Sequence, residues 1–279
     1  MGKLLIVDGS NLLFQMFYGM PARIIGANGK PIQGTLGFVG ALGRIIRMVK
    51  PSHVAVLFDG ECENVRKELD EDYKANRPDY AELPEEEIPF SQLPDIYAAL
   101  DVMGIAHRET TCCETDDWIA AGVHAYAGEH EIVISSQDSD FFQLISEVVH
   151  ILRYRGDKTV ICDIPWLRDR LGIAPSQYAA YKSLTGDTAD NIRGAEGIGP
   201  KTAAELMNRF ADLESLIAGS EQIHKPSVRA SVQRNAERLR KNYQLICLEG
   251  SAEFPFSLEQ MRYIQQGLTT KEVLERIGL

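Results

Sequence analysis

The hexapeptide KLLIVD at residues 3–8 decides the fold of this chain. A short apolar run that closes with an acid predicts a buried strand of a parallel sheet. Similar runs occur at residues 54–59 (VAVLFD) and 131–136 (EIVISS), and helical patterns lie between them, for example at 36–49 and 96–103. Strands that alternate with helices predict an α/β fold, with a mostly parallel central sheet and helices on both faces.

Acidic residues lie at the end of each predicted strand. Asp8 and Asp59 close the first two strands, and Asp138 and Asp140 follow directly after the third. A single Asp at such a position is usually a turn or cap residue. Ligands of parallel sheets bind outside the carboxyl ends of the strands, however, so acids from three strands at one edge favour a functional site.

A second acidic cluster, Glu114, Asp116 and Asp117, precedes a helical pattern at 118–126. Capping and the helix dipole explain acids in a first helical turn, and for this cluster alone that explanation is as good as a metal site. Glu114 and Asp117 are three residues apart, so on a helix they share a face and could reach one cation together.

The segment LTGDTADNIRGAEGIGPKTA at residues 184–203 combines two features. Asp187 and Asp190 form an acid pair in a stretch rich in turn residues, and residues 197–201 (GIGPK) predict a tight loop that opens a helix. Backbone N–H groups of such a loop can bind a phosphate. One short segment thus offers both metal ligands and a phosphate site.

These groups supply nine candidate metal ligands: Asp8, Asp59, Glu114, Asp116, Asp117, Asp138, Asp140, Asp187 and Asp190. The formal net charge of −11 argues at first against a nucleic-acid partner. Acids that converge on a metal site are neutralised by bound cations, however, so most of this charge says little about the outer surface. Oxygen ligands favour Mg²⁺ or Mn²⁺ over zinc, and two such ions form the clamp used in phosphodiester hydrolysis.

Basic residues are concentrated in two parts of the chain. Residues 64–94 are dense in charge and predict either a solvated connection or a binding loop, in which Tyr73, Lys74 and Arg77 could contact bases and phosphates. After residue 161 the strand pattern stops, and short helical patterns lead to a basic helix predicted at 228–243.

Other classes of protein fit the sequence poorly. No apolar run approaches the roughly 20 residues that span a membrane, and no signal peptide is recognisable. The five cysteines are scattered through the chain, which is typical of reduced thiols in a cytoplasmic protein. The six histidines form no cluster of metal ligands.

The chain resembles the bacterial and phage 5′ nucleases, that is, the flap endonucleases and the 5′–3′ exonuclease domain of DNA polymerase I. Seven stretches carry the resemblance in the order of the family: VDGSNLLF (7–14), GTLGFVGAL (34–42), LFDG (57–60), VRKELDEDYKANRP (65–78), ETDD (114–117), SQDSDFFQL (136–144) and LTGDTADNIRGAEGIGPKTA (184–203). The resemblance implies a PIN-like nuclease core at residues 1–170, with a helical arch or gateway at about 64–94. It further implies a helical DNA-binding region at 171–279, with a helix–three-turn–helix at about 184–210.

The same resemblance assigns roles to the acids. Asp8, Asp59, Glu114, Asp116 and Asp117 would serve a first ion, and Asp140, Asp187 and Asp190 a second. Asp138 would lie close to both ions. The expected cofactors are Mg²⁺ or Mn²⁺, in two or more sites.

It also implies the contacts with DNA. Lys74 and Arg77 would place the scissile phosphate, with Asp138 as the third catalytic residue. Further DNA contacts would come from Arg66, Tyr73, Arg193, Gly197, Gly199 and Lys201, and a K⁺ ion would bind the loop of Gly197, Ile198 and Gly199.

The implied reaction is Mg²⁺-dependent cleavage at 5′ flaps and ends in replication and repair, leaving a 5′-phosphate and a 3′-hydroxyl. Nicked, gapped and RNA–DNA hybrid duplexes are further expected substrates. The protein is expected to be monomeric, to have no membrane partner and to stand alone without a polymerase segment.

Several residues depart from the family pattern. Gln15 and Arg193 replace a common Arg and a common Pro, Gln137 follows Ser136 before the Asp-x-Asp, and the region after residue 78 is longer and more acidic. Other readings include a structure-specific DNA-binding protein with weak catalysis and a single-strand ribonuclease. An aspartyl phosphatase is disfavoured because Ser10 stands where a second Asp is required.

Overall fold

The computed structural model describes residues 2–27, 29–60, 65–77, 80, 83–84, 87–111, 113–248, 250 and 252–279. A six-stranded sheet in the order β3-β2-β1-β4-β5-β6 forms the centre, and all neighbours are parallel except β5 and β6. Its strands are β1 (Gly2–Asp8), β2 (His53–Phe58), β3 (Ala106–Glu109), β4 (His130–Ser135), β5 (Val149–Arg153) and β6 (Val160–Cys162). The predicted α/β fold is confirmed.

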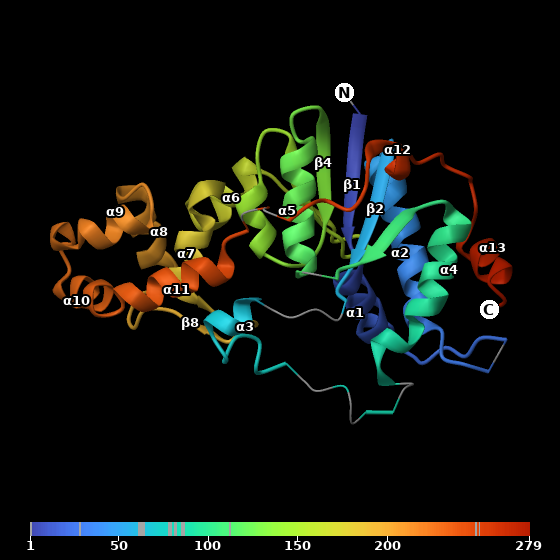
Figure 1. The fold of residues 1–279 in the computed structure, drawn as a ribbon, viewed down its shortest axis with the longest axis horizontal. Coiled ribbons are helices and arrows are strands. Elements are labelled where there is room, and N and C mark those ends of the chain that lie inside the picture. Colours follow the sequence, from blue (N-terminus) through green and yellow to red (C-terminus); the bar gives the residue numbers. More distant parts are fainter. Residues whose placement is uncertain are drawn as a thin grey trace.

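Alternate residues of β1 enter two different apolar cores, as expected for a strand buried on both faces. Leu5 and Val7 pack among the helices on one face, and Leu4 and Ile6 pack on the other. The first face is covered by α1 (Gly9–Gly19), α2 (Gln33–Val49) and α4 (Leu93–Met103), and the second by α5 (Thr115–Tyr126). Figure 1 shows this layered half of the molecule on the right.

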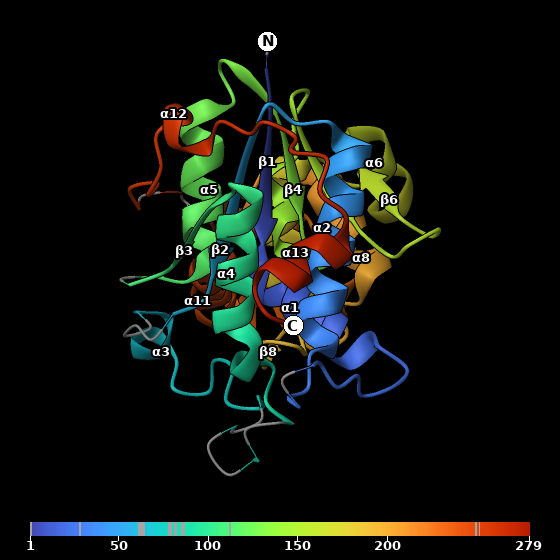
Figure 2. The ribbon, with the colours of Figure 1, turned by 90° about the vertical axis from the view of Figure 1, so that its right-hand side faces the viewer.

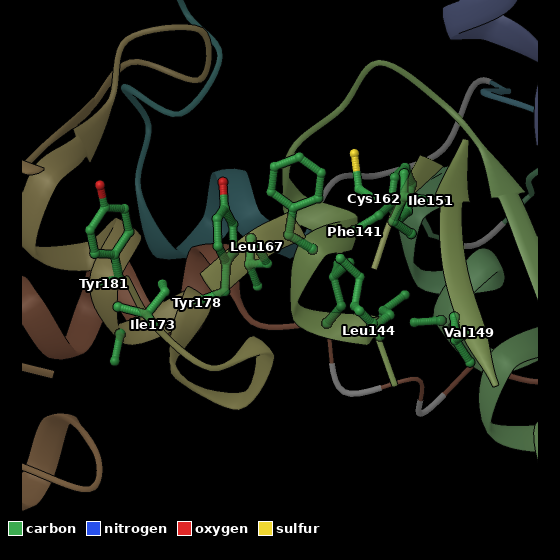
Figure 3. Packing of buried hydrophobic residues seen from close by; sticks show 14 of the residues in the cluster. Phe141, Leu144, Val149, Ile151, Cys162, Leu167, Ile173, Tyr178 and Tyr181 are labelled. Atoms are coloured by element: carbon green, nitrogen blue, oxygen red, sulfur yellow. The ribbon is translucent and has the colours of Figure 1, made fainter. Parts of the chain in front are cut away.

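The second core continues without a break into the helical half of the molecule. Figure 3 shows Phe141 and Leu144 between Val149 of the sheet and Tyr178 of the helical region. This continuity fixes the helical half against the sheet. The helical half contains η3 (Asp140–Leu144), α6 (Ile164–Leu171), η4 (Pro175–Gln177), α7 (Tyr178–Thr185), β7 (Gly186–Asp187), β8 (Ile192–Arg193), α8 (Pro200–Arg209), α9 (Leu213–Ala218) and η5 (Ser220–Gln222).

The basic stretch predicted to be helical at 228–243 is helical but divided. The structure has two helices, α10 (Pro226–Arg234) and α11 (Ala236–Ile246), that are separated at Asn235. The Asn235 side chain donates to Ser231 O and Glu196 Oε2, at 2.8 and 2.9 Å. Asparagine competes well for backbone partners in this way, which explains the break.

The arch expected at 64–94 lies partly outside the described residues, which omit 64, 78–79, 81–82 and 85–86. Its described part contains the short helix α3 (Val65–Leu69), turns up to residue 77 and the 3₁₀ helix η2 (Pro89–Gln92).

The C-terminal segment returns from the helical half to the sheet. Tyr263 N donates to Ser52 O (2.9 Å) beside β2, after the short helix α12 (Leu258–Met261). Helix α13 (Thr270–Arg276) then lies against α2 and α4, as Figure 2 shows, and its Val273 joins their apolar core while Leu274 is also buried. Within the described ranges, none of the helices has the length and apolar character that a membrane span requires.

Candidate metal centre

Asp8 lies buried at the junction of β1 and α1, where it caps the helix. Its carboxylate accepts hydrogen bonds from Asn11 N (3.0 Å) and from Ser136 Oγ (2.8 Å) at the end of β4. Burial, followed by repulsion from Asp59, raises the pKa of Asp8 to about 7. The ends of β1, β2 and β4 therefore meet, as the sequence predicted.

Asp59, Asp116 and Asp138 surround the same point. Asp59 Oδ1 accepts from Thr115 N (3.2 Å), which ties β2 to the start of α5. Burial, then the charge of Asp138, raises the pKa of Asp116 well above its ordinary value. Together with Asp8, these carboxylates make an oxygen donor set that suits a hard divalent cation.

A second group consists of Asp140, Asp187 and Asp190, whose carboxylate oxygens lie within 4.8 Å of one another. Asp140 comes from η3, Asp187 from β7, and Asp190 from the turn that follows. This cluster could hold a metal ion, and its members are those expected at a second ion.

Lys182 enters the second group and was not predicted. Its Nζ forms ion pairs with Asp140 and with Asp187, the latter at 2.5 Å. Burial raises the pKa of Asp140 to about 7 although Lys182 opposes this, and the carboxylates raise the pKa of Lys182 against its own burial. The only sequence signal was that Lys182 is the single charged residue in the helical pattern at 175–184.

Glu114 and Asp117, predicted as metal ligands, are held by basic side chains. Arg66 Nη1 lies 2.8 Å from Glu114, and Arg66 Nη2 lies 2.7 Å from Asp117. Lys74 Nζ lies 2.6 Å from Glu114, and Tyr73 Oη donates to the same carboxylate at 3.2 Å. Residues expected to contact DNA thus pair with acids expected to serve the metal.

The base of the expected arch is also attached to the second acidic group. Arg77 Nη2 lies 2.9 Å from Asp190 Oδ1, and Lys74 N donates to Asp190 O at 3.0 Å. Lys74 has a φ of 56°, a conformation that side chains other than glycine rarely adopt. Lys74 and Arg77, in the described part of the expected arch, are therefore connected to the second acidic group.

The loop at residues 194–199 is shaped by glycine. A Cβ on Gly194 would lie 2.4 Å from Leu184 O, so only glycine allows this close approach, and Gly197 has a φ of 75°. Arg193 and Lys201 are exposed beside the loop, and within the described ranges neither forms an ion pair. Arg238 and Arg240, by contrast, pair with Glu196 (3.0 Å) and Glu214 (2.8 Å).

Family comparisons agree with this architecture. Residues 3–172 match the 5′-3′ exonuclease N-terminal resolvase-like domain, and residues 173–267 match the 5′-3′ exonuclease C-terminal SAM fold. The chain thus combines a resolvase-like domain, which carries the candidate metal ligands up to Asp140, with a helical domain of the SAM fold, which carries Asp187 and Asp190. The chain belongs to the 5′-3′ exonuclease family.

Among individual proteins, the chain is similar to bacterial DNA polymerases I. It is 33% identical over 266 residues to DNA polymerase I of Rhizobium leguminosarum, covering 92% of this chain and 26% of that protein. It is 32% identical to the thermostable DNA polymerase I of Thermus aquaticus, over 88% of this chain and 28% of that one. The chain thus spans about a quarter of the length of these relatives.

Solved structures share the fold. The T5 D15 protein co-crystallised with metal ions has a TM-score of 0.72 at 22% identity, covering 99% of this chain and 98% of that one. The T5 D15 flap endonuclease variant in a pseudo-enzyme-product complex with DNA and metal ions also has a TM-score of 0.72, over 99% and 97% of the two chains.

Proposed function

We propose that this chain is a structure-specific 5′ nuclease that hydrolyses DNA phosphodiesters at 5′ flaps and ends. The observation that carries the proposal is the convergence of seven carboxylates from separate segments into two adjacent groups. Bound Mg²⁺ or Mn²⁺ would supply an activated water and would neutralise charge at the phosphorus. The products would carry a 5′-phosphate and a 3′-hydroxyl.

Each acidic group has a separate task in this proposal. Asp8, Asp59, Asp116 and Asp138 would hold the first ion. Asp140, Asp187 and Asp190 would hold the second, with Lys182 withdrawn from them. Glu114 and Asp117 would act through Arg66 and Lys74, which already contact them.

Lys74 and Arg77 would orient the substrate. Both now pair with acids, at 2.6 Å for Lys74 with Glu114 and 2.9 Å for Arg77 with Asp190. A phosphodiester brought to the metals would compete for the same guanidinium and ammonium groups. The two side chains would then hold the phosphate beside Asp138.

The helical region at 171–279 would bind the duplex. Arg193 and Lys201 are exposed and flank the loop of Gly197, Ile198 and Gly199, whose carbonyl groups could hold K⁺. Contacts to phosphates alone would select DNA by structure and not by sequence. Nicked or gapped DNA and RNA–DNA hybrids are substrates to test, and we expect a monomeric cytoplasmic enzyme.

A labelled 5′-flap duplex, with and without Mg²⁺, tests the proposal. The wild type should release the flap only with Mg²⁺, and Asp138→Ala should lose at least a thousandfold in rate. Asp169→Asn, which removes an exposed acid from α6, serves as the matched control. Metal-independent cleavage, or full activity in Asp138→Ala, would refute the proposal.

A structure-specific DNA-binding protein with weak catalysis is the second candidate. The ion pairs of Lys182 and Arg77 favour it, because they compensate the second acidic group without a metal. This candidate predicts tight flap binding without measurable cleavage at saturating Mg²⁺ or Mn²⁺.

A further inference from the structure

Gln137, directly before Asp138, has all four of its polar groups hydrogen bonded. Its N–H donates to Asn11 Oδ1 (3.0 Å), and its carbonyl accepts from Arg153 Nη2 (2.9 Å). In the side chain, Nε2 donates to Tyr154 O (2.8 Å) and Oε1 accepts from Arg155 Nε (3.0 Å). These hydrogen bonds hold the Gln137 side chain in one conformation.

A second amide strengthens the same junction. Gln15 Nε2 also donates to Tyr154 O, at 2.7 Å, so α1 and the loop after β4 converge on the end of β5. Because β5 runs parallel to β4, this end lies at the edge of the sheet that carries Asp138. The backbone of Arg155 therefore lies at the edge of the sheet that carries the candidate metal ligands.

The Arg155 guanidinium is held by a hydrogen bond, but no acidic side chain of the described residues balances its charge. The side chain is exposed, and its Nε bond goes to a neutral amide oxygen. Across the part of the chain that the structure describes, no carboxylate forms an ion pair with Arg155, whereas Arg66 and Arg77 both pair with acids. Its two terminal nitrogens thus keep their donors and their positive charge for a ligand.

The hairpin that carries Arg155 is itself ordered. Arg155 N donates to Thr159 Oγ1 (3.1 Å), and Thr159 Oγ1 donates to Gly156 O (2.6 Å). A planar guanidinium whose Nε is fixed presents its remaining N–H groups as an oriented fork, which matches two oxygens of a phosphodiester. Little side-chain entropy then remains to be lost on binding.

We propose that Arg155, oriented by Gln137, is a phosphate-binding residue for the nucleic-acid strand that reaches the metal centre. The ligand would be a backbone phosphodiester on the same side of the sheet as the scissile one, since the guanidinium contacts Gln137, the residue directly before Asp138. This assignment rests on the proposed nuclease function. Gln137 acts as a positioning residue for Arg155.

Binding of a fluorescent 5′-flap duplex in EDTA, measured at several salt concentrations, tests the assignment without cleavage. Arg155→Ala should weaken binding roughly tenfold and lower the slope of log affinity against log salt by about one. Arg155→Lys should keep the slope but recover only part of the affinity, because lysine has no Nε to anchor. Arg170→Ala, on α6 away from this edge in Figures 1 and 2, is the matched control.

A second experiment tests whether Gln137 orients the Arg155 guanidinium. Gln137→Ala should weaken binding by less than Arg155→Ala, and the double variant should bind no more weakly than Arg155→Ala alone. Additive losses would show that Gln137 does not act through Arg155. Mn²⁺ affinity of Arg155→Ala should equal that of the wild type.

The outcomes separate the two proposals. If Arg155→Ala binds as tightly as Arg170→Ala while the wild type binds and cleaves flaps, the Arg155 assignment is wrong and the nuclease proposal stands. If the wild type neither binds nor cleaves flaps, both proposals fail.

Discussion

The two acidic groups of the metal centre differ in what surrounds them. Asp8, at the end of β1, and Asp116, in the first turn of α5, are disfavoured as charged groups by burial and by neighbouring acids. Asp140 and Asp187, in the helical half, share the ammonium group of Lys182. In the first group, the charge of Lys74 acts on Asp116, but Lys74 forms its ion pair with Glu114. The second group instead contains Lys182, which forms direct ion pairs with two of its carboxylates.

This difference predicts different responses to metal. A divalent ion at the strand-end group relieves repulsion and displaces at most protons. An ion at the second group must first separate Lys182 from its carboxylates. We therefore expect the strand-end site to bind the first ion more tightly, and substitutions in the two groups to have opposite effects on the metal-free protein.

The largest expected change follows from Lys182→Met. It leaves two carboxylates without their cation, which should destabilise the metal-free protein by about 3–5 kcal/mol. Urea denaturation at pH 7.5 in EDTA measures this, with the exposed Lys225→Met as control. Mn²⁺ should restore part of the lost stability. If Lys182→Met has the same denaturation midpoint as the wild type, Lys182 does not stabilise the second acidic group and the proposed difference between the two groups is wrong.

Asp8→Asn should have the opposite sign. Folding raises the pKa of Asp8 from 3.8 to about 7, so between these values the folded state keeps a proton that the unfolded state releases. The stability of the metal-free wild type should therefore fall as pH rises from about 4 to about 7. The variant should lose the part of this slope that Asp8 contributes, while the raised pKa values of Asp116 and Asp140 keep the rest, and it should gain up to roughly 4 kcal/mol at pH 8. Thermal melts of both proteins from pH 4 to 8 measure this. A wild type whose stability rises over this range would contradict the raised pKa of Asp8.

Arg77→Gln should change stability little. The Asp190 side chain is 10% exposed, but the Arg77 side chain is 53% exposed, so solvent screens the pair and its contribution should be about 1 kcal/mol. Cleavage should nevertheless slow, because the phosphate-orienting group is lost. Comparing the denaturation midpoint with the single-turnover rate separates the two effects.

Lys201→Ala should leave both acidic groups unaffected. Stability should stay within about 0.5 kcal/mol, since Lys201 is exposed beside the loop. DNA affinity should fall with a salt slope reduced by about one, while Mn²⁺ binding is unchanged. Unchanged DNA affinity at low salt would mean that this loop does not bind the duplex.

Much of this arrangement is predictable because it is local. The strands that end near Asp8 and Asp59 show their apolar runs plainly, and parallel pairing then brings their ends together. Strand β3 (Ala106–Glu109) was missed because AHRE has no apolar run. Lys182 lies 42 residues from Asp140, and only the packing of α7 on η3 brings the two together.

The return of the C-terminus has a consequence for synthesis on the ribosome. Helix α13 covers the outer side of α2 and α4, yet Thr270 is added 167 residues after Met103. At typical elongation rates this interval lasts on the order of ten to thirty seconds. Throughout that time the apolar surface of α2 and α4 that receives Val273 stays uncovered on the nascent chain, which makes it a surface that chaperones can recognise before α13 packs.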